Sequence, residues 1–141
     1  MPTVSAVVLA AGKGVRLGGG APKAFRPLRG RPMLEWSLEA LASLPEIREI
    51  TLVLPAGDFP VKDLRRYRVG GVVVGGEERF DSVLAGLRAL RETSDLLLVH
   101  DAARPLVRPE TVAAVIAAAD RAGGAIAAIP AADTLKRVGP G

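Results

Sequence analysis

The sequence predicts an α/β fold in which helices cover both faces of a mainly parallel sheet, giving three layers. Short apolar runs rich in Val, Leu and Ala alternate along the chain with longer runs whose apolar residues recur at helical spacing. Two of the apolar runs break directly into glycines, which is typical of buried strands that end at the edge of a sheet. With 141 residues, the chain is predicted to form a single domain over residues 1–141.

The first half of the chain is predicted to contain a strand, a helix and a second strand. Residues 3–11 form an apolar run with several β-branched side chains, which predicts a buried strand. Residues 33–42 carry apolar side chains at helical spacing, and Pro32 stands where the start of a helix tolerates proline. Residues 50–54 are apolar and end at Pro55, which predicts a short strand.

The second half continues the alternation. Apolar runs predict strands at residues 71–74, 96–99 and 125–129, and helical spacing predicts helices at residues 79–91 and 111–122. Glycine pairs close the first of these strands and the second of these helices. Strands that alternate with helices are joined by right-handed crossovers, so the sheet is expected to be mainly parallel.

Composition excludes several classes of protein. The chain has no cysteine, which rules out disulfides, thiolate catalysis and cysteine-based zinc sites. One Trp and one Tyr are too few for base stacking along a nucleic acid. The net charge of +4 suits a small anionic substrate as well as it suits a polymer. No apolar run is long enough to span a bilayer, and the N-terminus lacks a signal-peptide pattern. We expect a cytoplasmic protein without a nucleic-acid or membrane partner.

The loop at residues 12–23 is the strongest candidate for phosphate binding. Small residues let the backbone approach an anion, and successive N–H groups of such a loop can form an anion-binding nest. Arg16 and Lys23 add fixed positive charge. The loop is not a P-loop, because a glycine follows Lys13, and it lacks the dinucleotide fingerprint, because Leu17 stands in place of the third glycine. The alternative is a flexible turn after a strand.

Polar residues follow four of the predicted strands, and ligands of open α/β sheets bind beyond the carboxyl ends of the strands. These residues lie at 10–23, 75–82, 100–105 and 132–137. The first, third, fourth and fifth strand ends are therefore expected to line one edge of the sheet.

Individual residues on this edge have two possible roles each. Asp101 is the candidate Mg²⁺ ligand, because one carboxylate suffices when phosphates and water supply the remaining ligands. An Asp101–Arg104 ion pair that only fixes the loop is the alternative. Glu77 and Glu78 are either a solvated acidic pair or, since two glycines precede them, part of a backbone that closely approaches a flat group such as a base. Ser82 either faces that base or simply lies in the first turn of its helix. His100 has no predicted partners and is expected to be structural.

Three motifs together resemble those of a known enzyme family. They are A-A-G-x-G-x-R with a later P-K at residues 10–23, G-G-x-E-R-x-D-S-V at residues 75–83, and H-D-A-A-R-P at residues 100–105. The first is similar to the signature loop of sugar-phosphate nucleotidyltransferases. The other two resemble its CTP-using branch, the 2-C-methyl-D-erythritol 4-phosphate cytidylyltransferases. The resemblance runs from Val4 to Arg137 and implies a Rossmann-like fold of the nucleotide-diphospho-sugar transferase type.

The resemblance also implies residue roles. Arg16 and Lys23 would be catalytic and contact the triphosphate. Asp101 would bind Mg²⁺ and face the substrate. The residues implied to bind the nucleotide are Ala10, Ala11, Gly12, Gly14, Gly76, Glu77 and Ser82. The sugar phosphate would be contacted by Thr134 and Lys136, while Arg79 and Arg104 would brace the loops. The family often has Asp where this chain has Glu77.

The implied reaction is transfer of CMP from CTP to 2-C-methyl-D-erythritol 4-phosphate, with release of pyrophosphate, in non-mevalonate isoprenoid synthesis. Family members continue beyond this point through a dimerising arm and a C-terminal substrate-binding segment. We therefore expect the 141-residue chain alone to bind CTP but turn over poorly, and the intact protein to be a homodimer. The alternatives are a ribitol 5-phosphate cytidylyltransferase, a nucleotidyltransferase for another base, and a nucleotide-binding module without catalysis.

Overall fold

The computed structural model describes residues 1–12, 21–57, 61, 63–134, 136–137 and 139. In chain order its elements are β1 (Val4–Leu9), β2 (Pro27–Leu28), β3 (Arg31–Pro32), α1 (Met33–Ala42), β4 (Ile47–Leu54), β5 (Val69–Val74), α2 (Arg79–Arg88), β6 (Leu96–Asp101) and α3 (Pro109–Ala122). Short 3₁₀ helices lie at Lys23–Phe25 (η2) and Leu64–Tyr67 (η3). Within the described residues, every helix is too short or too polar to cross a membrane.

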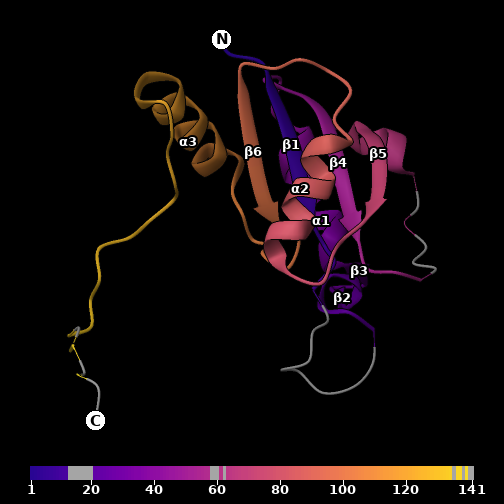
Figure 1. Cartoon of the computed structure of the whole chain (residues 1–141), viewed down its shortest axis with the longest axis horizontal. Coiled ribbons are helices and arrows are strands. Elements are labelled where there is room, and N and C mark those ends of the chain that lie inside the picture. The colour runs from indigo at the N-terminus through magenta and orange to yellow at the C-terminus, as the bar shows by residue number, and fades with distance from the viewer. Residues whose placement is uncertain (13–20, 58–60, 62, 135, 138, 140–141) are drawn as a thin grey trace.

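Four strands form a parallel sheet in the order β5-β4-β1-β6 (Figure 1). β1 is central, so Val7 is paired with Thr51 of β4 on one side and with Val99 of β6 on the other. Because all four strands run in the same direction, their carboxyl ends lie along one edge of the sheet. We call the described residues that follow these ends, 10–12, 75–82 and 100–104, the rim.

α1 and α3 lie on one face of the sheet. Leu34, Leu38 and Leu41 recur at helical spacing along α1 and are completely buried. Their partners in the main hydrophobic cluster include Val4, Ala6, Val8, Ile50 and Leu52 from the sheet, and Val112 and Ile116 from α3. Full burial of one such leucine stabilises the fold by roughly 1.5–3 kcal/mol.

α2 covers the other face, over β1 and β4 (Figure 1). Gly86 is buried in this helix, and a Cβ atom at that position would collide with the side chain of Val7. The missing side chain lets the helix backbone lie directly on the sheet. Helices on both faces of a parallel sheet confirm the predicted three-layer fold.

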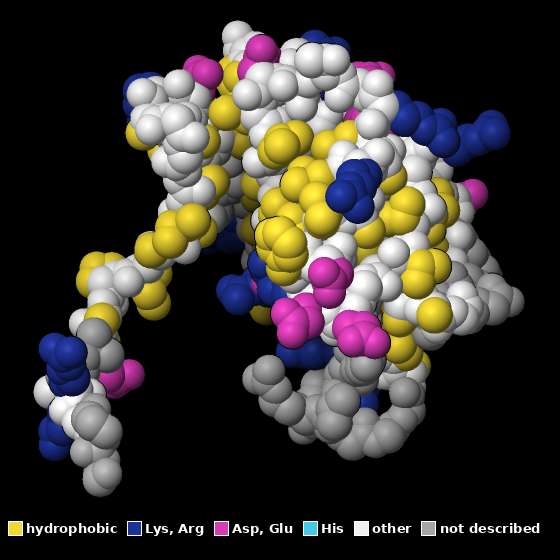
Figure 2. Space-filling view, in the orientation of Figure 1, with side chains coloured by type: hydrophobic (Ala, Val, Ile, Leu, Met, Phe, Trp, Pro, Cys, Tyr) yellow, Lys and Arg dark blue, Asp and Glu magenta, His cyan; other side chains and the backbone are white. Residues whose placement is uncertain are grey.

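The same face is less covered over β6. Leu97 and Val99 are 58% and 39% exposed, and Phe80 in the first turn of α2 is 72% exposed. Apolar side chains gather on the side of the molecule seen in Figure 2. α2 therefore shields the centre of the sheet and leaves this strand open to solvent in the described part of the chain.

The predicted strand at residues 125–129 is wrong. The structure has no strand there, and the chain leaves the sheet after α3 (Figure 1). Ile126 and Ile129 are 85% and 89% exposed. A strand forms where a neighbour pairs with its N–H and C=O groups, and within the described residues no strand pairs with this run. The apolar composition of this run does not show whether a neighbouring strand is present to pair with it.

Candidate functional site at the rim

Backbone hydrogen bonds extend the sheet beyond its strands and fix the start of each rim loop. The N–H of Ala10 donates to the carbonyl of Val53 at 2.8 Å, and the N–H of Ala102 donates to that of Leu9 at 2.9 Å. The N–H of Gly75 likewise donates to the last carbonyl of β4, at 2.8 Å. The ends of β1, β5 and β6 are therefore held along one edge of the sheet. This arrangement was predicted for four strand ends, and the structure shows it for these three.

Gly75 brings the loop after β1 against α2. A Cβ atom at Gly75 would lie 2.5 Å from the Cβ of Ala11 and 2.6 Å from the Oγ of Ser82, so only glycine fits. Ser82 is 5% exposed. The structure thus brings two of the predicted nucleotide-binding residues together. Ser82 lies in the first turn of its helix, and its contact with a base stays a prediction.

Gly76 allows a tight entry into α2. A Cβ atom at Gly76 would collide with the side chain of Asp81, whose carboxylate accepts a hydrogen bond from the N–H of Glu78 at 3.1 Å. This bond supplies an acceptor to the start of the helix, where free N–H groups favour negative charge. Glu77 is exposed beside it, and acidic side chains gather at this end of the molecule (Figure 2). The tight start of α2 therefore explains the glycine at position 76, in addition to the predicted approach of a base.

Asp101 lies between two arginines, one from the start of α2 and one from the loop after β6. Its Oδ1 is 3.1 Å from Nη2 of Arg79, and its Oδ2 is 3.4 Å from Nε of Arg104. The Asp101 side chain is 34% exposed and both arginines are more exposed, so these pairs contribute roughly 0–1 kcal/mol each to stability. The predicted Asp101–Arg104 pair is present, and Arg79 adds a link from the start of α2 to the end of β6.

Asp101 has the chemistry of a Mg²⁺ ligand. Its carboxylate oxygens are hard donors that point toward the two guanidinium groups rather than into the core. Among the described residues, no group of three or more His, Asp or Glu side chains could hold a metal by itself. A single protein carboxylate fits Mg²⁺ only when phosphates and water complete the coordination shell.

Ser37 in α1 supports the rim, and this role was not predicted from the sequence. It lies on the buried face of α1, and its Oγ donates to the carbonyl of Ala102 at 3.2 Å and approaches that of Arg104 at 3.4 Å. The N–H of Arg104 also donates to the carbonyl of Asp101 at 3.0 Å. The loop that carries Asp101 is thereby tied to α1. In the sequence, the only sign of this role was a serine among the leucines on the apolar face of the predicted helix.

His100 is partly buried at the end of β6. Burial lowers the pKa of its imidazole below the usual range, and the neighbouring Asp101 carboxylate and a backbone hydrogen bond with Arg104 oppose this shift in part. Its Nε2 atom is buried and has no hydrogen-bond partner within the described residues. The structural role of His100 stays a prediction.

The other predicted residues lie at different distances from the rim. Gly12 follows β1 and is exposed, and Lys23 is exposed in η2. Arg16 and Gly14 lie outside the described residues. Thr134 and Lys136 are exposed on the segment that leaves the sheet after α3, so the structure does not bring them to the rim (Figure 1). Their contact with a sugar phosphate stays a prediction.

The sequence is similar to a known family over almost its whole length. A family model described as IspD, 2-C-methyl-D-erythritol 4-phosphate cytidylyltransferase, matches residues 4–141. A protein of that name from Frankia casuarinae is 48% identical in a gapped alignment of 141 positions, which covers 97% of this chain and 52% of the relative. One from Streptomyces avermitilis is 49% identical in a gapped alignment of 144 positions, which covers 96% of this chain and 58% of the relative.

Solved structures show the same fold. The 2-C-methyl-D-erythritol 4-phosphate cytidylyltransferase of Thermus thermophilus superposes with a TM-score of 0.70 at 37% identity, over 94% of this chain and 57% of that protein. A 4-diphosphocytidyl-2C-methyl-D-erythritol synthase superposes with a TM-score of 0.76 at 28% identity, over 99% of this chain and 64% of that protein. The chain spans about half the length of the curated relatives it matches. With the rim, the three motifs and these matches in agreement, the chain belongs to the 2-C-methyl-D-erythritol 4-phosphate cytidylyltransferase (IspD) family.

Proposed function

We propose that this chain supplies the CTP-binding part of an enzyme that transfers CMP from CTP to 2-C-methyl-D-erythritol 4-phosphate. The products would be diphosphate and 4-diphosphocytidyl-2-C-methyl-D-erythritol. The observation that carries the proposal is the meeting of the β1 loop, Gly75, Ser82 and Asp101 at one rim. The names of the relatives favour this acceptor over ribitol 5-phosphate.

The reaction needs no nucleophile from the protein. An oxygen of the acceptor phosphate attacks the α-phosphorus of CTP in line, forming a P–O bond. The bond from that phosphorus to the oxygen bridging to the β-phosphate breaks, and diphosphate leaves with the electron pair. The protein must position two anions that repel each other and stabilise the charge of the transition state. Arg16 and Lys23 would do so through the positive charges of their side chains.

The nucleotide would lie across the glycine-rich ends of β1 and β5. Backbone N–H groups at Ala11 and Gly12 are suited to phosphate oxygens. The N–H of Ala10 is already bonded to Val53, so Ala10 would contact the nucleotide through its other atoms. Cytosine would lie near Gly76 and Ser82, where a carbonyl or carboxylate can accept from its amino group and a hydroxyl can donate to its ring acceptors. The packing of Ser82 under Gly75 supports this placement.

Asp101 would hold a Mg²⁺ ion, which when bound would neutralise charge on the phosphates. The carboxylate is engaged by Arg79 and Arg104, so metal binding requires these arginines to release it. The released guanidinium groups are then available for phosphate oxygens. Because the existing pairs are exposed and weak, this exchange has a low cost. The family resemblance also leads us to propose a cytoplasmic homodimer, which light scattering of the intact protein tests.

Calorimetric titration of this chain with CTP, UTP and GTP in the presence of Mg²⁺ tests the proposal. We expect CTP to bind in preference to the other two, and Lys23→Ala to weaken binding by about tenfold, as loss of one charged hydrogen bond predicts. Arg121→Ala, which removes the same charge from the exposed end of α3, is the matched control. Equal binding of all three nucleotides would contradict the cytosine site.

Catalysis is tested separately by diphosphate release from CTP, Mg²⁺ and the acceptor. Release by the intact protein that is lost in Asp101→Asn supports the enzyme. Tight CTP binding with no release from the intact protein would instead favour a nucleotide-binding module.

A further inference from the structure

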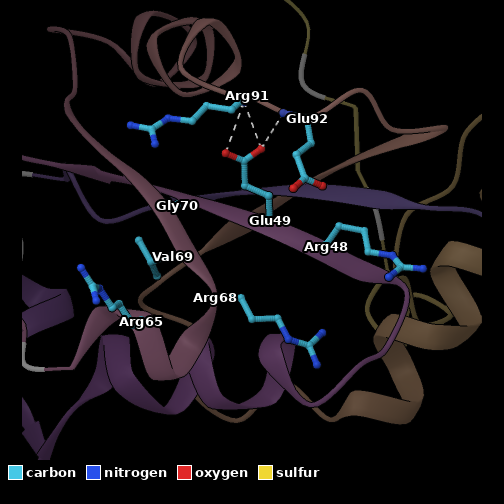
Figure 3. Close-up of a pocket in the computed structure, with 8 residues that line it drawn as sticks. All are labelled: Arg48, Glu49, Arg65, Arg68, Val69, Gly70, Arg91 and Glu92. Atoms are coloured by element: carbon cyan, nitrogen blue, oxygen red, sulfur yellow. Dashed lines mark hydrogen bonds between the residues drawn. The ribbon is translucent and has the colours of Figure 1, made fainter.

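A cavity of about 340 Å³ lies at the opposite edge of the sheet from the rim, where β4 and β5 begin. We call this edge the amino edge. The charged residues of the cavity come from β4, η3 and the loop after α2, and they are Arg48, Glu49, Arg65, Arg68, Arg91 and Glu92 (Figure 3). We call it the arginine pocket. Its volume is at the lower end for small-molecule sites.

Glu49 is already bound by the protein. It is 4% exposed, and its two carboxylate oxygens accept hydrogen bonds from the N–H of Arg91, at 3.0 and 3.3 Å, and from the N–H of Glu92, at 3.1 Å. Figure 3 shows the carboxylate pointing at this stretch of backbone. Its negative charge therefore holds the loop after α2 in place, and no guanidinium group of the described residues pairs with it.

Arg68 is bound as well. Its Nη1 donates to the backbone carbonyls of Leu44 at 3.0 Å and Ile47 at 2.8 Å. These bonds fix the turn before β4 against the turn before β5. Arg68 therefore acts as a structural link, and its side chain extends away from Glu49 and Gly70 (Figure 3).

Three guanidinium groups of the pocket have no partner among the described residues. Within the part of the chain that the structure describes, the side chains of Arg48, Arg65 and Arg91 make no ion pair or hydrogen bond. Glu92 is the remaining carboxylate of the pocket, and its side chain makes no bond to these described residues either. Several like charges around one small cavity repel each other, and an anion bound between them would relieve that repulsion.

Gly70 leaves space at the floor of the cavity. A Cβ atom there would lie 3.0 Å from Oε1 of Glu49, so a side chain would press on the fixed carboxylate and fill the space above it. In Figure 3 the side chains of Arg65 and Arg91 extend to the same side of Gly70, one from η3 and one from the loop after α2. The guanidinium groups of Arg65 and Arg91 would approach an anion bound here from two directions.

We propose that the arginine pocket is a second anion site, separate from the rim, that binds a small ligand with a diphosphate group. Guanidinium groups match phosphate oxygens because each offers two parallel N–H donors. Two linked phosphates present enough oxygens for Arg65 and Arg91 together. Arg48 extends to the other side of Glu49 (Figure 3), so it would add positive charge from a distance. The site lies at the far edge of the sheet from Asp101, so its ligand would bind while the rim holds a nucleotide.

Calorimetric titration with inorganic diphosphate, in buffer without divalent ions, tests this proposal. We expect the Arg65→Ala/Arg91→Ala double variant to lose affinity by at least about tenfold, because each charged hydrogen bond to phosphate is strong. The matched control is Arg108→Ala/Arg121→Ala, which removes the same charge from the two ends of α3. The control is expected to stay within about twofold of the parent chain.

Lys23→Ala separates the two sites. If diphosphate binds at the arginine pocket, this variant binds it with unchanged affinity, and amide NMR signals of Gly70, Arg91 and Glu92 shift on titration. Binding that is unchanged in the double variant, or lost in Lys23→Ala with shifts only at Gly12 and Gly75, would overturn the proposal. The side chains removed in the two double variants make no contact that holds the core, so all chains are expected to fold, and thermal melting checks this.

Discussion

The rim and the amino edge of the same sheet both combine carboxylates with arginines, but they pair them in opposite ways. At the rim, the carboxylate of Asp101 is bound by two exposed guanidinium groups. At the amino edge, the carboxylate of Glu49 is buried and bound by backbone N–H groups. The side chains of Arg48, Arg65 and Arg91 therefore have no carboxylate partner among the described residues. Side-chain pairs in solvent exchange at low cost, whereas buried backbone bonds do not. The first edge is therefore suited to accept a cation, and the second an anion.

The largest expected effect comes from the glycine that shapes the rim. Gly75→Ala should lower the free energy of unfolding by about 3 kcal/mol, because the new Cβ atom would overlap Ala11 and Ser82 in a closed space. Gly124→Ala, at a position with open space around it, is expected to change the value by less than about 0.5 kcal/mol. Urea denaturation measures both. Similar values for the two variants would show that the rim loops separate easily.

Glu49→Gln tests the buried acid of the amino edge. The amide has one acceptor oxygen and an NH₂ group that faces backbone donors, so we expect a loss of about 2 kcal/mol. Glu92→Gln is the control in the same pocket and should cost less than about 0.5 kcal/mol. It should also strengthen diphosphate binding by removing a negative charge. A Glu49→Gln chain as stable as its parent would contradict the structural role of this carboxylate.

Asp101→Asn tests whether the acid of the rim is exchangeable. We expect the free energy of unfolding to change by less than about 1 kcal/mol, because the lost ion pairs are exposed. The increase in CTP affinity that Mg²⁺ provides should disappear in the same variant. Asp120→Asn on α3 serves as the control for loss of a carboxylate. If Asp101→Asn destabilised the chain as strongly as Glu49→Gln, the contrast between the two edges would be refuted.

The smallest effect concerns His100, beside the rim. Its pKa is lowered by burial, so between that value and the unfolded pKa of about 6.5 the unfolded chain binds more protons. The free energy of unfolding should therefore fall as the pH drops below about 6.5, by at most about 1.4 kcal/mol per pH unit. His100→Asn should flatten this region of the profile. The chain has one histidine, so a slope that persists in the variant would have to come from another type of group.

The sequence predicted the central elements well because their patterns are local. The helix at 33–42 matches α1 at both ends, and the strands found at β1, β4, β5 and β6 lie where apolar runs predicted them. The predicted helix at 79–91 ends earlier, at Arg88, because the N–H of Leu90 bonds back to Leu87 in a tighter turn. The run at 125–129 failed because pairing depends on a neighbour that composition does not specify.

Contacts between distant residues explain what the sequence did not predict. The rim motifs were found because each is continuous in the chain and follows a strand. Ser37 was missed because its role depends on a carbonyl 65 residues away. The arginine pocket joins positions 48, 65 and 91, and it depends on which charges the backbone has already engaged. A list of arginines does not contain that information.

The central position of β1 has a consequence for how the chain is synthesised. β1 leaves the ribosome first among the strands, yet its two neighbours are residues 47–54 and residues 96–101. Its apolar side chains stay without their final partners until residue 101 has been made. Pairings between residues so far apart form slowly, and an unpaired apolar strand is prone to aggregation. The strand that precedes the proposed phosphate-binding loop is thus also a segment that benefits from protection by chaperones during translation.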